Sequence, residues 1–296
     1  MQTLREIRRL LEEAGLRPRK EFGQCFLIDG NLMGKLVELA GLTGEEAVLE
    51  VGPGTGSLTE ELLARAARVV AVEIDRGLCE LLHRRLGERD DFLLIRGDAL
   101  AGKHALSEEV LAALPGDAHL VANLPYSVAT PLVAECLIQS WRALCGPAAG
   151  GCAFRRLTFT VQREVADRLS AGPGSRAYGP VSVLAALVGR VCPGPIIPAG
   201  AFWPRPKVDS RVVQIDFDAD RAAGLADVEA LVDVVGLAFG ERRKQIRAIT
   251  RRKGSRFAAE ALASALAEGG IEPSLRPEQI APERYRLLAN ALASAP

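Results

Sequence analysis

The sequence has no long hydrophobic run. It contains no stretch of about 18 consecutive apolar residues, which is close to the length that a membrane-spanning helix requires. Residues 1–20 place charged side chains between apolar ones at helical spacing, so the continuous apolar segment of a secretory signal is also absent. These absences exclude a membrane-embedded protein and predict a cytoplasmic one.

Recurrent metal-binding patterns are missing as well. The chain has six cysteines and three histidines, and no two cysteines are separated by two residues. Structural zinc sites usually depend on such closely spaced ligands. We therefore expect no metal site, and we interpret the cysteines as buried or incidental reduced thiols.

Charge of one sign is lacking overall, because 37 Lys and Arg residues balance 37 Asp and Glu residues. The balance fails locally at residues 240–256, which are rich in Lys and Arg and hold Glu241 as their only acid. The basic residues that begin this segment are Arg242, Arg243, Lys244 and Arg247. A local excess of positive charge is typical of a polyanion-binding face. A solvated helix surface gives the same pattern, and charge alone does not separate the two.

Strand-like and helix-like segments alternate through much of the chain, after a helical segment at residues 2–15. The strand-like runs are residues 47–51, 69–73, 92–98, 119–123 and 156–162. Alternation of this kind predicts an α/β fold with a parallel sheet and right-handed crossovers.

The pattern changes in the last third of the sequence. Residues 191–210 are rich in proline, and we expect a rigid, non-helical loop there before a last strand at 211–217. Residues 221–296 are rich in Ala and Leu with helical periodicity. A chain of 296 residues is also longer than most single cores. The expected domains are an α/β domain over 1–218, with a helical extension at 1–19, and an all-α domain over 219–296.

A glycine-rich turn follows the strand-like run at 47–51. Gly52 and Gly54 let the backbone approach a ligand closely, and the helix after the turn offers free backbone N–H groups. Glu73 ends the next strand, where a carboxylate can accept hydrogen bonds from both hydroxyls of a ribose. Together these features predict a nucleoside-containing cofactor at the carboxyl ends of the strands. A purely structural turn is the alternative, and the G-x-G-x-G spacing differs from the dinucleotide-binding pattern.

Asp98 closes the third strand-like run. Its carboxylate can accept a hydrogen bond from the exocyclic amine of an adenine, or it can simply cap the following segment. The spacing of the sequence does not decide between these two roles.

Asn123 ends the fourth strand and is followed by Leu124, Pro125 and Tyr126. Pro125 keeps Leu124 out of the helical conformation, which leaves carbonyl groups without a partner in the sheet. These carbonyls and the Asn123 amide oxygen are acceptors, and Tyr126 offers a flat face. Two acceptors and a stacking surface fit the Watson–Crick edge of an adenine. A turn that ends the strand, with a tyrosine in the core, is the alternative.

Eight segments carry a resemblance to a known family. They are KEFGQCFLID (20–29), EVGPGTGSLTEEL (50–62), VVAVEID (69–75), RGDAL (96–100), NLPYSVATPL (123–132), VQREVADRLSAGPGSRAYGPVSVL (161–184), FWPRPKVDS (202–210) and FGERRKQIR (239–247). They resemble the ribosomal RNA adenine dimethyltransferase family, in particular its bacterial small-subunit enzymes, from about Lys20 to Ala293. The glycine turn is common to many methyltransferases, and Asn-Leu-Pro-Tyr is characteristic of N6-adenine enzymes. The last three segments separate this family from other methyltransferases.

The resemblance implies a Rossmann-like class I methyltransferase sheet that binds S-adenosylmethionine, and a small helical C-terminal domain that binds RNA. The cofactor contacts that it and the glycine turn imply are Cys25, Leu27, Gly52, Gly54, Glu73, Asp98 and Asn123. It implies that a flipped adenine is held between Tyr126 and Phe202. Asn123 and Leu124, fixed by Pro125, would accept hydrogen bonds from N6. Arg242, Arg243, Lys244 and Arg247 would contact RNA.

The implied substrate is a pair of adjacent adenosines in the hairpin near the 3′ end of small-subunit (16S) rRNA. Each would be methylated twice by a monomer acting on the immature 30S subunit. One rival is a large-subunit (23S) rRNA adenine methyltransferase, which the segments PKVDS and YGPVSVL disfavour. A second is a non-catalytic ribosome-assembly factor, which the intact Asn-Leu-Pro-Tyr stretch and Glu73 disfavour. A third is an NAD-dependent oxidoreductase. The glycine spacing of that class is absent from this chain, and so is a residue for the acid–base chemistry of hydride transfer.

One position departs from the family. Where the family usually has Asn after Gly-Gln, or His in some relatives, this chain has Cys25. A thiol is a weak hydrogen-bond partner. A contact from this position is therefore expected to come from the backbone, and no step of the implied chemistry needs Cys25 as a nucleophile.

Overall fold

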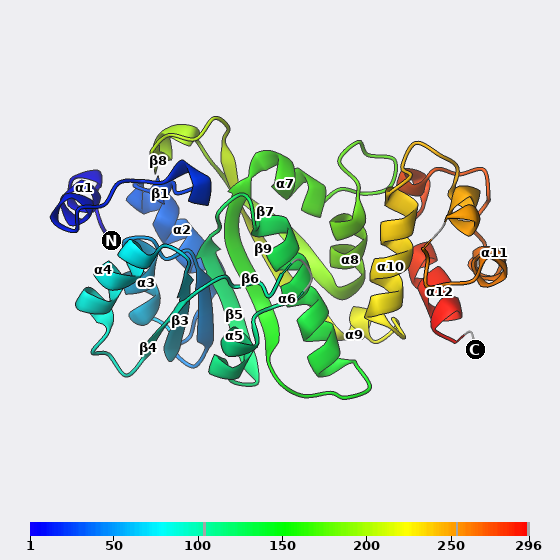
Figure 1. Ribbon diagram of the computed structural model, residues 1–296, viewed down its shortest axis with the longest axis horizontal. Helices are drawn as coiled ribbons and strands as arrows, with labels where there is room; N and C mark the ends of the chain where they lie inside the picture. The colour runs from blue at the N-terminus through cyan, green and yellow to red at the C-terminus, as the bar shows by residue number, and fades with distance from the viewer. Residues whose placement is uncertain (103–104, 253, 295–296) are drawn as a thin grey trace.

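The computed structural model describes residues 1–102, 105–252 and 254–294, and a seven-stranded sheet forms its centre (Figure 1). The strand order is β4-β3-β2-β5-β6-β9-β7. Strands β4 to β6 pair in parallel, whereas β9 pairs antiparallel with both β6 and β7. The strands of this sheet are β2 (Ala47–Val51), β3 (Arg68–Glu73), β4 (Phe92–Arg96), β5 (Asp117–Asn123), β6 (Ala153–Gln162), β7 (Gly189–Ile197) and β9 (Ser210–Phe217). The predicted α/β fold is confirmed, with an antiparallel edge added to the parallel strands.

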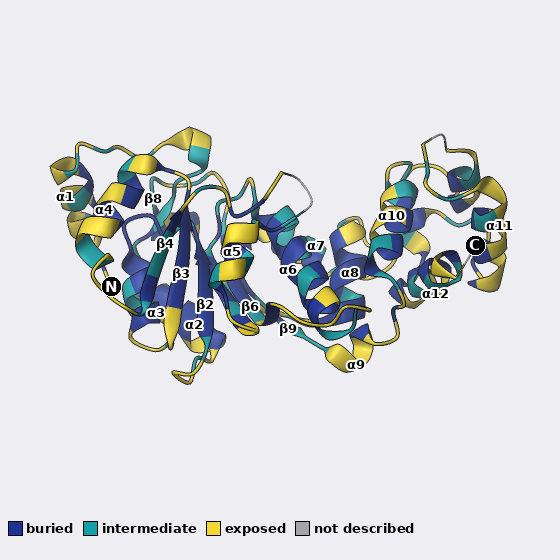
Figure 2. Cartoon of the chain, turned by 60° about the horizontal axis from the view of Figure 1, so that its bottom comes forward, coloured by how far each residue is buried: buried dark blue, intermediate teal, exposed yellow. Residues whose placement is uncertain are grey.

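Alternate residues of the strands contribute to two hydrophobic clusters on opposite faces of the sheet. On β3, Val69 and Ala71 belong to one cluster, and Val70 and Val72 belong to the other. Figure 2 shows the central strands buried and the outer sides of the surrounding helices exposed. The first cluster includes helices α2 (Gly30–Ala40) and α3 (Ser57–Leu63), and the second includes α5 (Glu108–Ala113), α6 (Ala129–Leu144) and α8 (Pro180–Val188).

The N-terminal segment packs beside the sheet. Ile7 and Leu11 of α1 (Leu4–Glu13) form a small cluster with Leu78 and Leu81 of α4 (Arg76–Leu86). The predicted N-terminal helix is therefore confirmed. A short 3-10 turn (Lys20–Phe22) follows α1, and then β1 (Phe26–Leu27) pairs antiparallel with β8 (Phe202–Trp203), apart from the main sheet.

The described residues after Phe217 contain helices and turns but no strand. The elements are α9 (Ala219–Ala222), α10 (Val228–Phe239), α11 (Ala259–Glu268) and α12 (Pro282–Ala293), with 3-10 turns at Ile246–Arg251 and Pro277–Gln279. Their apolar side chains join the second cluster of the sheet, so one core runs through both parts of the chain. The helical C-terminal region is confirmed, and a domain boundary at residue 218 stays a prediction. Across the described residues, no helix is both long and apolar enough to span a membrane.

The proline-rich segment corrects one expectation. Residues 191–197 were expected in a loop, but they belong to β7, which pairs with β9 at the edge of the sheet and contains Pro193 and Pro195. Proline has no N–H to donate, and an edge strand leaves alternate N–H groups without a partner in any case. The pairing register shifts between Pro193 and Ile196, which accommodates the rings. A 3-10 turn (Ala199–Ala201) then leads to β8.

Candidate functional site

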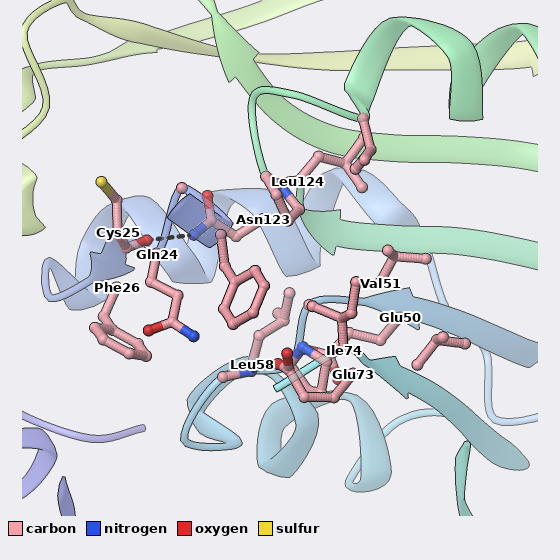
Figure 3. A pocket seen from close by; sticks show the side chains of 18 of the residues that line it. Gln24, Cys25, Phe26, Glu50, Val51, Leu58, Glu73, Ile74, Asn123 and Leu124 are labelled. Carbon is pink, nitrogen blue, oxygen red and sulfur yellow. Dashed lines mark hydrogen bonds between the residues drawn. The ribbon is translucent and has the colours of Figure 1, made fainter. Parts of the chain in front are cut away.

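A cleft of about 240 Å³ opens at the carboxyl ends of β2, β3, β4 and β5 (Figure 3). These ends share one edge of a parallel sheet, so residues far apart in the sequence meet there. The predicted site residues that line the cleft are Cys25, Leu27, Gly52, Gly54, Glu73, Asp98, Asn123, Leu124, Pro125 and Tyr126. The N-terminal segment, through residues 21–27, forms the wall opposite the strand ends.

The glycine turn allows two other segments to close on it. Gly52 and Gly54 have φ angles of 74° and 62°, which L side chains rarely adopt. A Cβ atom on Gly52 would lie 3.1 Å from Cγ of Pro125, and one on Gly54 would lie 2.9 Å from Cε1 of Phe26. Glycine is therefore required at both positions by backbone conformation and by space.

Gln2 holds the glycine turn from outside, a role that the sequence analysis did not predict. Its Nε2 donates to the Thr55 carbonyl oxygen at 3.1 Å, and its Oε1 accepts from Thr55 Oγ1 at 2.7 Å. The Gln2 backbone N–H donates to Ser57 Oγ at 3.0 Å. Gln2 is only 5% exposed, and Thr55 and Ser57 both line the cleft. No local pattern could have found a contact across 53 residues.

Two buried carboxylates line the cleft. Glu73 accepts hydrogen bonds from the N–H groups of Gly54 at 3.2 Å and Asp75 at 2.9 Å. Glu50, which the sequence analysis did not select, is 1% exposed, and its Oε2 has no partner among the described residues. Burial, with repulsion from Glu73, raises the pKa of Glu50 from 4.5 to about 8, and burial also raises the pKa of Glu73. A positive charge bound beside the pair would favour the ionised carboxylates and oppose this rise.

Asp98 performs the capping role that the sequence left open. Its Oδ1 accepts from the Leu100 N–H at 3.0 Å. The same residue lines the cleft, so capping does not remove it from the site. Ile74 lies between Glu73 and Asp75 and is 50% exposed at the cleft, where it offers an apolar surface to a planar ligand.

Asn123 is fixed by a contact on each side of its carboxamide. Its Nδ2 donates to the Cys25 carbonyl oxygen at 2.9 Å, and its Oδ1 accepts from the Thr160 hydroxyl. An amide oxygen accepts two hydrogen bonds, so Oδ1 keeps one free acceptor position. Figure 3 shows the Cys25 carbonyl facing Asn123 while the thiol points away from it. Burial raises the pKa of that thiol, which keeps it protonated.

The residues after Asn123 supply a second acceptor and an aromatic face. No described residue donates a hydrogen bond to the Leu124 carbonyl oxygen. The half-buried Tyr126 lines the cleft, and its hydroxyl lies 2.8 Å from Ser210 Oγ at the start of β9. Burial raises the pKa of Tyr126, so the phenol stays neutral.

Phe202 lies apart from the cleft. It is 3% exposed, and its ring packs in the first hydrophobic cluster with Leu27, its partner in the β1–β8 pair. It is not among the residues that line the cleft, so the structure does not bring it together with Tyr126. Stacking of a base on Phe202 stays a prediction from the resemblance.

The basic segment lies at the C-terminal end of α10, away from the cleft (Figure 1). Arg243 and Arg247 are exposed, whereas Lys244 pairs with Glu241 at 3.0 Å. Arg242 donates to the Arg176 carbonyl oxygen at 2.8 Å, so it also fixes a neighbouring loop. Lys253, in the same segment, lies outside the described residues. RNA binding by these side chains stays a prediction.

Two solved structures share this fold. A dimethyladenosine transferase from Plasmodium falciparum aligns with a TM-score of 0.68 and 21% identity over 89% of this chain and 95% of that chain. The 23S rRNA methyltransferase ErmE aligns with a TM-score of 0.60 and 24% identity over 91% of this chain and 100% of that chain. At these identities the likeness concerns the fold alone, and it confirms the predicted Rossmann-like fold.

Sequence comparison is more specific. The chain is 38% identical to a protein of Phenylobacterium zucineum named ribosomal RNA small subunit methyltransferase A, over 98% of this chain and 94% of the relative. A protein of the same name from Paenarthrobacter aurescens is 40% identical over 97% of this chain and 92% of the relative. The profile of the family described as ribosomal RNA adenine dimethylase matches residues 15–293. The chain belongs to the ribosomal RNA adenine dimethylase family.

Proposed function

We propose that the chain is an rRNA methyltransferase that uses S-adenosylmethionine to dimethylate N6 of two adjacent adenosines near the 3′ end of small-subunit rRNA. Family membership and the small-subunit methyltransferase names of relatives at 38–40% identity support this activity. The same names disfavour the large-subunit alternative. In this proposal, as in the expectation from the sequence, the chain acts as a monomer on the immature 30S subunit in the cytoplasm.

The cleft fits S-adenosylmethionine, which joins an adenosine to a positively charged end. The buried Glu50 and the neighbouring Glu73 suit a cationic ligand, because a positive charge beside them would favour their ionised forms. Glu73 would hold the ribose hydroxyls, Asp98 the adenine amine, and the turn at Gly52 and Gly54 would let the ligand approach the backbone. When bound, this cofactor supplies a methyl group already activated by its sulfonium sulfur, so the chain needs no nucleophile of its own.

The chain's own task is to orient the adenine amine. N6 is a weak nucleophile because its lone pair is delocalised into the ring. Asn123 Oδ1 and the Leu124 carbonyl oxygen would accept its hydrogen bonds, direct the lone pair, and stabilise the positive charge that develops on N6. Stacking on Tyr126 would hold the extruded base, contributing roughly 1–3 kcal/mol. The proton lost from N6 would leave to water.

One observation carries this proposal. The Asn123 amide is fixed between the Cys25 carbonyl and the Thr160 hydroxyl, and the next carbonyl along the chain has no donor. Two neighbouring acceptors are thus held in the lining of the cleft.

The test is methyl transfer from labelled S-adenosylmethionine to purified ribosomal particles. We expect label in small subunits that lack the modification, at two adjacent adenosines, and none in large subunits. Small subunits that already carry the modification serve as the control and should take up no label. Label in large-subunit RNA would support the rival substrate, and tight binding without transfer would support an assembly factor.

A further inference from the structure

Two hollows flank α7 (Arg163–Leu169) and meet there. The first is lined by the start of α7 and by the loop between β8 and β9. The second is lined by α7, the segment at residues 176–180 and the end of α10. Glu164 lines both hollows, so they are neighbours on the surface of α7, and we refer to the two together as one depression.

The first hollow adjoins the proposed catalytic residues. Gln162, the last residue of β6, lines it, and Thr160 two positions earlier holds the Asn123 amide. Asp209 also lines it, and the next residue, Ser210, holds the Tyr126 hydroxyl at 2.8 Å. The hollow therefore begins within two residues of both contacts that position the site.

The second hollow leads to the basic segment. Arg242 lines it and belongs to residues 240–256, and its Nη2 donates to the Arg176 carbonyl oxygen in the opposite wall. Figure 1 shows the β8 loop, α7 and the end of α10 following one another along one side of the molecule. The two hollows thus lie between the residues that hold Asn123 and Tyr126 and the C-terminal helices.

The charged side chains of this depression are mostly basic and without partners. Arg163, Arg176, Arg205 and Lys207 are exposed, and none forms an ion pair with any described residue. Of the acids, Asp209 accepts from the Ala199 N–H. Glu164 pairs with Arg168 at 3.3 Å. An arginine that only stabilises the fold usually has a carboxylate or carbonyl partner. Unpaired cations on a concave surface instead fit phosphate groups.

We propose that this depression, the α7 track, binds the phosphate backbone of the RNA strand that enters the site. Residues Arg205 and Lys207 hold the phosphates nearest the target adenosine, and Arg176 holds phosphates farther along the strand. Phosphate contacts of this kind fix the register of a nucleic acid without reading its bases. The track therefore decides which nucleotide reaches Asn123. The proposal rests on the proposed function, because it assigns the route of the same substrate.

The first test is the salt dependence of binding to RNA from unmodified small subunits. In the Arg205→Gln, Lys207→Gln double variant we expect the slope of log K against log salt to become shallower by about 1–2, because each lost phosphate contact contributes roughly 0.7–0.9. Cofactor affinity should not change. The matched control is Arg5→Gln, Arg84→Gln, which removes from α1 and α4 two exposed cations that form no ion pair with any residue the structure describes. A wild-type slope in the track variant would overturn the proposal.

The second test compares the positions along the RNA that the two ends of the α7 track contact. A thiol-directed photo-crosslinker is attached to Lys207→Cys or Arg176→Cys, in a chain whose exposed Cys192 is replaced by Ser. We expect crosslinks from position 207 closer to the modified adenosines than those from position 176. The reverse order, or crosslinks only to an acidic ribosomal protein, would overturn the track. Failure of the proposed function is distinguishable, because it would appear as absent methyl transfer in the wild-type chain.

Discussion

The carboxamide nitrogen of Asn123 donates a 2.9 Å hydrogen bond to the backbone carbonyl oxygen of Cys25. This contact ties the N-terminal wall of the cleft to the end of β5 across 98 residues. The sequence alone presented Cys25 as a departure from the family. In the structure the backbone of that position makes the contact, and the thiol takes no part in it.

A side-chain change at Cys25 should therefore matter little. We expect Cys25→Ala to alter cofactor affinity and transfer rate by no more than about threefold, in line with substitutions that remove no specific interaction. Isothermal calorimetry and single-turnover transfer would measure the two quantities. A tenfold loss in either would show that the thiol itself contributes.

Gln2 gives the N-terminal segment a role in the cofactor site. Gln2→Ala removes both side-chain hydrogen bonds to Thr55 and frees the glycine turn. At about 0.5–1.5 kcal/mol for each of the two hydrogen bonds, we expect cofactor affinity to fall by about 5-fold to 150-fold. The transfer rate at saturating cofactor should change much less.

Thr3→Ala is the matched control for Gln2. Thr3 caps α1 by accepting from the Glu6 N–H, and it forms no hydrogen bond with residues 52–57 of the turn, all of which the structure describes. Its loss should lower the free energy of unfolding by about 1 kcal/mol and leave cofactor affinity unchanged. If both variants weakened cofactor binding equally, general destabilisation would explain the result, and the hydrogen bonds from Gln2 to the turn would not.

Gly54 cannot carry a side chain without disturbing the cleft. In Gly54→Ala the new Cβ would lie 2.9 Å from the Phe26 ring at a φ of 62°. The left-handed backbone alone should cost about 1–2 kcal/mol, and we expect cofactor binding to weaken strongly. Gly34→Ala, on α2 with nothing within 4 Å, should instead be stabilising by about 0.5–1 kcal/mol. Thermal unfolding with and without cofactor measures both, and normal cofactor binding by Gly54→Ala would contradict the steric argument.

Glu50 should make the stability of the cofactor-free chain depend on pH. Its pKa is raised from 4.5 to about 8 by burial, so between these values the folded chain keeps a proton that the unfolded chain releases. The stabilisation is complete below the unfolded pKa and is lost as pH rises through the folded one. With rising pH the free energy of unfolding should fall less steeply in Glu50→Gln than in the wild type, by up to about 1.4 kcal/mol per pH unit.

Urea unfolding across that pH range measures the slope. The exposed Glu88→Gln is the control, and its slope should match the wild type. A Glu50→Gln slope equal to that of the wild type would mean that Glu50 is ionised in the folded chain.

Much of the sheet was predictable because most of its strands have a recognisable local sequence pattern. Buried parallel strands are short apolar runs, and β2 begins and ends where the sequence placed it, at residues 47–51. Glu73 and Asn123 were found because each ends such a run at the shared edge of the sheet. By contrast, β7 was missed because its prolines argue against a strand everywhere except at an edge.

The rest of the site depends on contacts that no local pattern contains. Gln2 reaches the glycine turn only once α1 has packed on α4. Glu50 lies within a continuous apolar run, where its burial beside Glu73 cannot be read from the sequence. The α7 track joins cations from three separate segments, so only the folded chain brings them into one depression.

The most direct test of the account is single-turnover methyl transfer by Asn123→Ala at saturating cofactor and RNA. We expect a rate lower by about 100-fold to 1000-fold, the usual effect of removing one group that stabilises developing charge. Binding of cofactor should remain measurable in the same variant. A transfer rate within a few-fold of the wild type would contradict the claim that the Asn123 amide orients the adenine amine.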